Sequence, residues 1–230
     1  MAEDTTTLQR QLWLRTLYSL PVFAVILFAP AGTLHYWQGW IFGIVFAGSS
    51  TALGAYFLRH DPELIKRRMR AGPAAEQRPA QKIIMSLTLF GFLLLMVLPG
   101  FDHRLQHGSP VPAWLTIAAN AGIAVSFWFF FLVLRQNSYA ASTIQVEAGQ
   151  PVISTGLYSM VRHPLYAAAV LLLFCIPLAL GSYWTLLIVV PMLPVLGWRL
   201  IDEEHFLVRN LPGYADYCQQ VRFRLIPGIW

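Results

Sequence analysis

Two groups of chemically active residues lie near the C-terminal end of the sequence, on either side of a long apolar run. The first is Arg162-His163-Pro164, and the second ends in Glu203-Glu204. The first group can bind an anion, because Pro164 is favoured at the first position of a helix and a helix N-terminus presents free N–H groups. The two glutamates can bind an ammonium or a pair of hydroxyls. Together, the groups would hold a ligand that has both charges and hydroxyl groups.

The apolar run between the two groups, residues 164–198, contains no charged side chain. It is about twice as long as one membrane span. Gly181-Ser182 stands near its middle and predicts a turn. The turn divides the run into two helices of about 17 to 18 residues, each rising about 27 Å. Because the second helix returns to the interface from which the first one starts, we expect His163, as the N-cap of the first helix, to lie close to Glu203.

A simpler interpretation of these charged residues is also open. Arg162 and Arg199 are typical of anchors at a membrane interface, and Arg199 could pair with Glu203 four residues later on one helix. S-adenosylmethionine has a carboxylate, an ammonium, a sulfonium and a ribose diol, which match the charges and hydroxyls that the two groups require. The residues by themselves do not single out this ligand.

The composition predicts a membrane protein. Of 230 residues, 57% are apolar and 12% are charged, whereas soluble domains have about 25% charged residues. The basic residues behind the net charge of +5 do not lie on aromatic-rich soluble segments. This pattern excludes nucleic acid as a partner and favours the anionic surface of a lipid bilayer.

Charge-free runs cover residues 16–34, 36–58, 83–101, 105–134 and 164–198. We therefore expect an all-α, polytopic integral membrane protein with six transmembrane helices, or five if the first only dips into the bilayer. Six alternating spans place Arg104 alone on one side and the other fifteen Lys and Arg residues on the opposite side. By the positive-inside rule, both termini and the loop 59–82 are cytoplasmic. That basic loop either sets the topology or lies on anionic headgroups.

The motifs around the hairpin resemble the isoprenylcysteine carboxyl methyltransferase family and the related phospholipid methyltransferases, in particular bacterial integral-membrane members. The resemblance covers about residues 145–230, and the earlier spans match in character more than by motif. The matching residues are Gly156-Leu157-Tyr158, Arg162-His163-Pro164-Leu165-Tyr166, Glu203-Glu204, Leu211-Pro212-Gly213-Tyr214 and Tyr217.

The resemblance implies a multi-pass methyltransferase of the bacterial inner membrane, with S-adenosylmethionine bound at the cytoplasmic mouth of a C-terminal helical hairpin. The acceptor is a lipophilic small molecule, a prenylated cysteine carboxylate or a lipid, and it enters from the bilayer. Residues 1–135 would be the N-terminal transmembrane helices with the basic loop, and residues 136–230 the methyltransferase core. The residues expected to bind the cofactor are Gly156, Tyr158, His163, Pro164, Leu165, Tyr166, Glu203 and Glu204, and Gln145 is a candidate for its adenine.

Three residues are expected to act on the acceptor. On the family pattern, Arg162 and a tail arginine orient it. Arg222 and Arg224 are the candidates for the tail position, because Gln219 and Gln220 stand where relatives often have basic residues. Glu204 is the nearest candidate base for an acceptor that must lose a proton.

Two other functions are compatible with the sequence. A nicotinamide-dependent reductase resembling the sterol reductases would have a related C-terminal region, and a lipid-binding or transport protein would use the same polar residues only as anchors. No metal site is expected, because His103 and His107 have helical spacing but no accompanying carboxylates.

Overall fold

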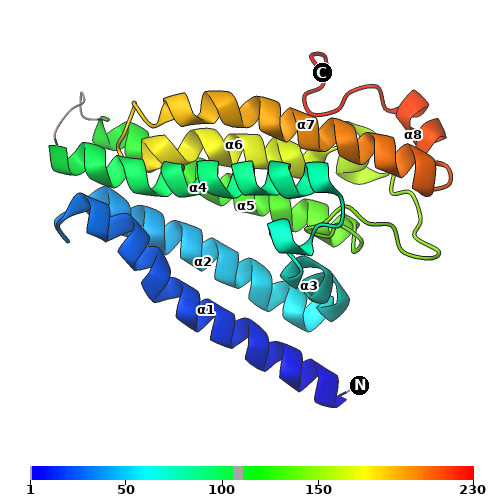
Figure 1. The fold of residues 1–230 in the computed structure, drawn as a ribbon, viewed down its shortest axis with the longest axis horizontal. Helices are drawn as coiled ribbons and strands as arrows, with labels where there is room; N and C mark the ends of the chain where they lie inside the picture. The colour runs from blue at the N-terminus through cyan, green and yellow to red at the C-terminus, as the bar shows by residue number, and fades with distance from the viewer. Residues whose placement is uncertain (1, 106–110) are drawn as a thin grey trace.

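The computed structural model describes residues 2–105 and 111–230, and over these residues its secondary structure consists of helices without strands (Figure 1). The expected all-α class is confirmed. The elements are α1 (Ala2–Ala31), α2 (Trp37–His60), α3 (Pro62–Met69), η1 (Pro73–Ala75), α4 (Pro79–Leu105), α5 (Ala113–Gln136), η2 (Gly156–Ser159), α6 (Pro164–Ala179), α7 (Leu186–Asn210) and α8 (Tyr214–Gln220).

Four helices, α1, α2, α4 and α5, are long and apolar enough to cross a membrane. They correspond to the first four charge-free runs, so the polytopic membrane architecture is confirmed. α6 is also apolar but has 16 residues. α4, α5, α6 and α7 run nearly along one direction, while α1 and α2 are inclined to them, and both termini lie toward the end of the molecule that contains α3 and α8 (Figure 1).

The predicted hairpin is present, with a turn between α6 and α7 in which Gly181 has φ of +78°. Its two helices differ in length from the expectation of two equal halves, because α7 has 25 residues and continues through Glu203 and Glu204. No helix-breaking residue follows until Pro212-Gly213. The acidic pair therefore lies within the helix and not at its exit.

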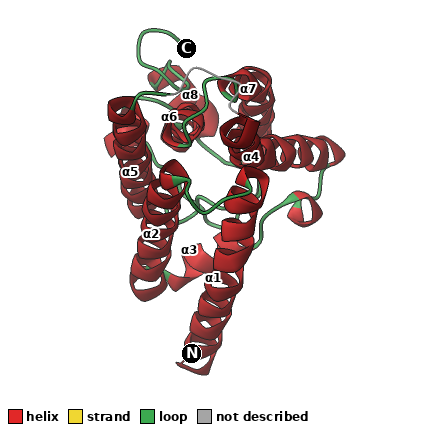
Figure 2. Ribbon diagram, turned by 90° about the vertical axis from the view of Figure 1, so that its left-hand side faces the viewer, coloured by secondary structure: helices red, strands yellow, loops and turns green. Residues whose placement is uncertain are grey.

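α3 is a short amphipathic helix in the basic loop. The side chain of Asp61 caps it by accepting a hydrogen bond from the N–H of Leu64 at 3.0 Å, and Pro62 occupies its first turn. Leu64 and Ile65 are buried. In Figure 2, α3 lies between α1 and α2. The loop is thus folded against the bundle and is not a plain connection.

One apolar core joins the N-terminal helices to the hairpin. Leu27, Phe42 and Leu95 pack in the same cluster as Ile176 of α6. α5 and α6 approach so closely that a Cβ on Gly122 would lie 2.5 Å from the sulfur of Cys175, so glycine is needed there. This packing fixes the hairpin relative to the rest of the bundle.

Candidate active site

The N-terminus of α6 is held in place by the C-terminal tail. His163 is the N-cap residue and Pro164 follows at the first helical position, as expected. The N–H groups of Arg162 and His163 donate to the carbonyls of Phe223 and Arg224, each at 2.9 Å. The tail therefore lies beside residues 162–163, which explains how residues far apart in the sequence share one site.

Glu204 lies between two arginines and His163. Its carboxylate is 3.1 Å from Nε of Arg162, 3.2 Å from Nε2 of His163 and 2.8 Å from Nε of Arg224. Burial acts to raise the pKa of Glu204, but hydrogen bonds from His163 and Arg224, with the charge of Arg162, lower it overall. Glu204 is 6% exposed and is a fixed anion, whereas a general base at neutral pH has a raised pKa.

Glu203 points to the other side of α7. The hydroxyl of Tyr166 donates to its carboxylate at 2.5 Å, and Nε of Arg199 donates to the same hydroxyl at 3.1 Å. The simpler interpretation of the sequence allowed a direct ion pair between Arg199 and Glu203, but the two side chains do not form one. The guanidinium of Arg199 instead binds Glu76 at 3.0 Å and Gln81 at 2.7 Å, because both side chains reach it from the folded basic loop.

A cleft of about 110 Å³ lies beside the N-terminus of α6. Among the expected site residues, the structure places on its lining Gln145, Tyr158, Arg162, His163, Pro164, Leu165, Tyr166 and Glu203. Gly156, Glu204 and Arg222 do not line it. Glu204 faces Arg162, His163 and Arg224, as described above, and Arg222 is exposed. Gly156, with φ of +60°, lets the chain approach the side chain of Gln136. The side-chain oxygen of Gln136 accepts a hydrogen bond from the N–H of Leu157 at 2.9 Å.

Tyrosines form one wall of the cleft. Burial raises the pKa of Tyr158 to about 12, so this phenol stays neutral, and it accepts a hydrogen bond from Asn137 at 3.1 Å. Tyr217 donates to the carbonyl of Tyr158 at 2.7 Å. The hydroxyl of Tyr214 is buried and has no hydrogen-bond partner among the described residues. An unpaired buried hydroxyl is costly, and here a ligand in the cleft could satisfy it.

A larger, mainly apolar cavity of about 890 Å³ adjoins the cleft. α1, α2, α4, α5 and α6 all contribute to its walls. The cleft and the cavity share Ala141, Leu165, Tyr166 and Arg199 as lining residues. A polar compartment and an apolar one therefore meet at these four residues, and sequence patterns gave no sign of the second.

The basic loop supplies site residues that the sequence patterns did not identify. Arg67 makes a bidentate ion pair with Glu147, at 2.6 and 2.8 Å. Arg68 donates to the carbonyl of Ala140 at 3.0 Å. These contacts hold α3 against the segment that lines the cleft. Asp61-Pro62 is typical of the start of a helix, but the position of α3 beside the cleft depends on tertiary contacts.

No group of three or more metal-binding side chains occurs within the described parts of the chain, and His107 lies outside them. Residues 114–212 match the sequence profile of the phospholipid methyltransferase family. This segment spans α5, α6, α7 and most of the cleft, and it leaves out α1 to α4 and the tail after residue 212. No curated protein matches the chain.

Proposed function

From the match of residues 114–212 to the phospholipid methyltransferase family, we propose that the protein transfers a methyl group from S-adenosylmethionine to a lipophilic acceptor. The observation that best supports the proposal is the meeting of a polar cleft and an apolar cavity at Leu165 and Tyr166. A polar cofactor and an apolar acceptor can reach each other there without either leaving its own environment.

The residues of the cleft fit S-adenosylmethionine by chemistry. Glu203 offers a carboxylate for the ammonium or the ribose diol, and Arg162 and His163 with the N-terminus of α6 offer positive charge for the carboxylate. The unpaired hydroxyl of Tyr214 needs a partner. The cleft is smaller than the roughly 300 Å³ of a typical ligand site, so we expect its side chains to move apart on binding.

When bound, the cofactor would supply an electrophilic methyl group on a sulfonium. The protein then needs mainly to align the acceptor with that methyl group and to exclude water. A carboxylate acceptor can attack as it is, whereas a protonated amine must first lose a proton. Among the described residues that line the cleft, Glu203 is the one carboxylate, so it replaces Glu204 as our candidate for such a base.

We further propose the orientation in the membrane. α3, within the basic loop 59–82, and α8 lie at the end of the molecule toward which both termini point (Figure 1). Tyr214 and Tyr217 of α8 line the cleft, so the cleft is at the same end. By the positive-inside rule this end is cytoplasmic. The cofactor would then enter from the cytoplasm of a bacterial cell, and the acceptor from the inner membrane.

Calorimetry with S-adenosylhomocysteine on the purified protein in neutral detergent tests the proposal. We expect saturable binding, and no binding of NADPH. The Glu203→Gln variant should bind S-adenosylhomocysteine at least about tenfold more weakly, because a hydrogen bond to a charged group contributes about 1.5–3 kcal/mol.

The matched control is Glu63→Gln, which removes an acid on α3 that pairs with Lys66 at 2.8 Å and does not line the cleft. Its affinity for S-adenosylhomocysteine should equal that of the wild type. Saturable binding of NADPH, or no binding of S-adenosylhomocysteine to the wild type, would overturn the proposed function.

A further inference from the structure

Arg68 differs from the other cations around the site in its partners. Arg67 next to it pairs with Glu147, and Arg199 pairs with Glu76. The one hydrogen bond of the Arg68 side chain among the described residues is to the carbonyl of Ala140, at 3.0 Å. No described carboxylate lies within ion-pair distance of it. Most of its five N–H donors are therefore available.

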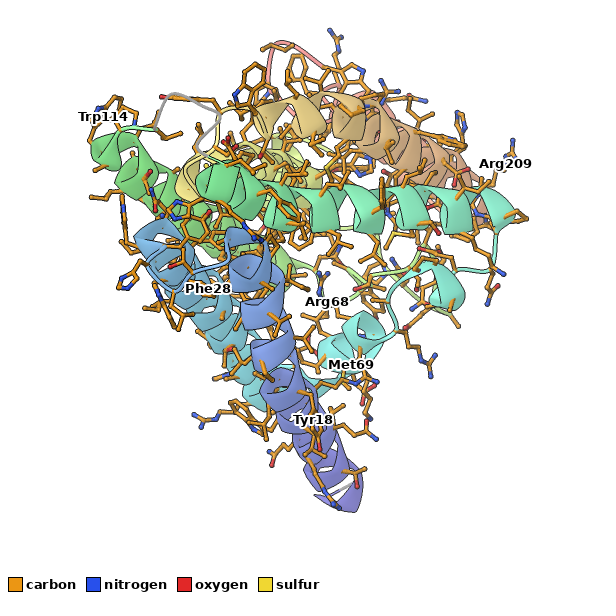
Figure 3. The ribbon with its side chains drawn as sticks, turned by 60° about the vertical axis from the view of Figure 1, so that its left-hand side comes forward. Tyr18, Phe28, Arg68, Met69, Trp114 and Arg209 are labelled. Atoms are coloured by element: carbon orange, nitrogen blue, oxygen red, sulfur yellow. The ribbon has the colours of Figure 1, made fainter. Side chains whose placement is uncertain are left out.

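The position of Arg68 makes this lack of a counter-charge significant. Arg68 is half-buried and lines the apolar cavity. Figure 3 shows it in the space between α3 and the long helices, in contrast to Arg209 at the far end of α7. Burial lowers the pKa of Arg68, yet an arginine stays protonated in proteins. A positive charge is thus held against an apolar space, which is costly without an anion.

Arg68 also lies close to the junction of the two compartments. Its guanidinium donates to the carbonyl of Ala140, which lines the cleft, and Arg68 lines the apolar cavity together with Ala141 and Tyr166. Tyr166 lines the cleft and the cavity, and the backbone carbonyl of Arg68 accepts from Ser142 at 3.1 Å. An anion on Arg68 would therefore be at the cleft end of the cavity, and an apolar chain attached to it would extend between the transmembrane helices.

We propose that Arg68 determines acceptor specificity by binding an anionic group of the acceptor, and that the acceptor is an anionic amphiphile whose apolar chain occupies the cavity. The inference deepens the proposed function and rests on it. Arg68 lies outside residues 114–212, so the family match does not assign it a role. The guanidinium supplies the charge complement, and the cavity of about 890 Å³ supplies the room for the chain.

The first test compares amphiphiles that share one chain and differ in the head. Dodecyl phosphate, dodecanoate and dodecanol are titrated calorimetrically into the wild type, Arg68→Gln and Arg70→Gln in neutral detergent, with inorganic phosphate as a further titrant. Arg70→Gln is the matched control, because it removes a charge from the same loop at an exposed residue that does not line the cavity. Binding of S-adenosylhomocysteine reports whether each variant keeps its cleft.

We expect the wild type and Arg70→Gln to bind the two anionic amphiphiles about ten- to a hundredfold more tightly than dodecanol, as charge-assisted hydrogen bonds would give. Arg68→Gln should lose this preference and keep its affinity for dodecanol. Equal preference in Arg68→Gln and the wild type would overturn the proposal. Binding of inorganic phosphate as tight as that of dodecyl phosphate would overturn it too, because the site would then be one for small anions.

The second test asks whether the amphiphile site is the acceptor site. Labelled S-adenosylmethionine is incubated with the protein and a lipid extract, and dodecyl phosphate should inhibit labelling by the wild type much more strongly than labelling by Arg68→Gln. Undiminished labelling at saturating dodecyl phosphate would show that acceptors bind elsewhere. If S-adenosylhomocysteine does not bind, the proposed function fails. A head preference in Arg68→Gln equal to that of the wild type, with intact S-adenosylhomocysteine binding, refutes the role of Arg68 alone.

Discussion

Replacing Glu204 by Gln should destabilise the protein, because Glu204 is the carboxylate that faces Arg162, His163 and Arg224. The substitution keeps the shape of the side chain and one oxygen acceptor but removes the charge. Arg162 and His163 have side-chain exposures of 9% and 5%, while that of Arg224 is 34%. Water can therefore compensate Arg224 but not the other two.

The magnitude follows from this burial. Removing one partner of a buried ion pair costs about 3–5 kcal/mol, and the retained amide oxygen favours the lower end. At about 2–4 °C per kcal/mol for a chain of this size, the melting temperature should fall by about 6–12 °C. We expect Glu203→Gln, the neighbouring substitution on the cleft side, to change it by much less.

The pH dependence of stability gives a second measure of the same substitution. Because the pKa of Glu204 is lower in the folded protein than the ordinary value of 4.5, its charge stabilises the fold above that pH. The stabilisation is lost as the pH falls through the folded pKa. The melting temperature of the wild type should therefore decrease below about pH 4.5, and Glu204→Gln should weaken this decrease.

Thermal unfolding in detergent between pH 3 and 8, read by intrinsic tryptophan fluorescence, checks both expectations for the wild type and the two variants. Calorimetry with S-adenosylhomocysteine at pH 7 accompanies it. If Glu204→Gln kept the wild-type melting temperature and acid profile but no longer bound S-adenosylhomocysteine, Glu204 would be a ligand contact and the structural role argued from its geometry would be refuted.

The ion pair between Arg67 and Glu147 and two tyrosines that line the cleft give further predictions. Arg67→Gln and Glu147→Gln should each lower the stability of the protein slightly. Their double-mutant cycle should give a coupling energy of up to about 1 kcal/mol, because solvent screens this ion pair. Additive effects would mean that the pair does not hold α3. Tyr214→Phe should keep the melting temperature of the wild type or raise it, because the substitution removes an unpaired buried hydroxyl. The affinity of this variant for S-adenosylhomocysteine should fall about two- to tenfold. Tyr217→Phe is its control, and it should lower the melting temperature because that hydroxyl is bonded to a carbonyl; equal losses of stability in both variants would contradict the distinction.

The positions of the helices could be predicted because their causes are local. Charge-free runs of about 20 residues predict spans. α2 follows its run closely, α4 extends beyond both ends of its run, and α5 begins at Ala113, within its run. Gly181 marks the turn of the hairpin, and Pro164 marks the start of α6. Helix length depends on helix-breaking residues in the same way: α7 continues past the first charged residue and ends at Asn210, just before Pro212-Gly213. Each of these features is determined by residues within a few positions along the chain.

The sequence by itself determined that the chain crosses a membrane, that a hairpin brings Arg162-His163 to Glu203-Glu204, and that these motifs resemble a methyltransferase family. Only the tertiary structure decided what each residue faces. Successive residues on a helix point about 100° apart, so neighbouring glutamates must face different surroundings, and packing selects which one meets the cations. The same holds for Arg68, because the partners of α3 and the walls of the apolar cavity come from helices distant in sequence, and no local pattern encodes their meeting.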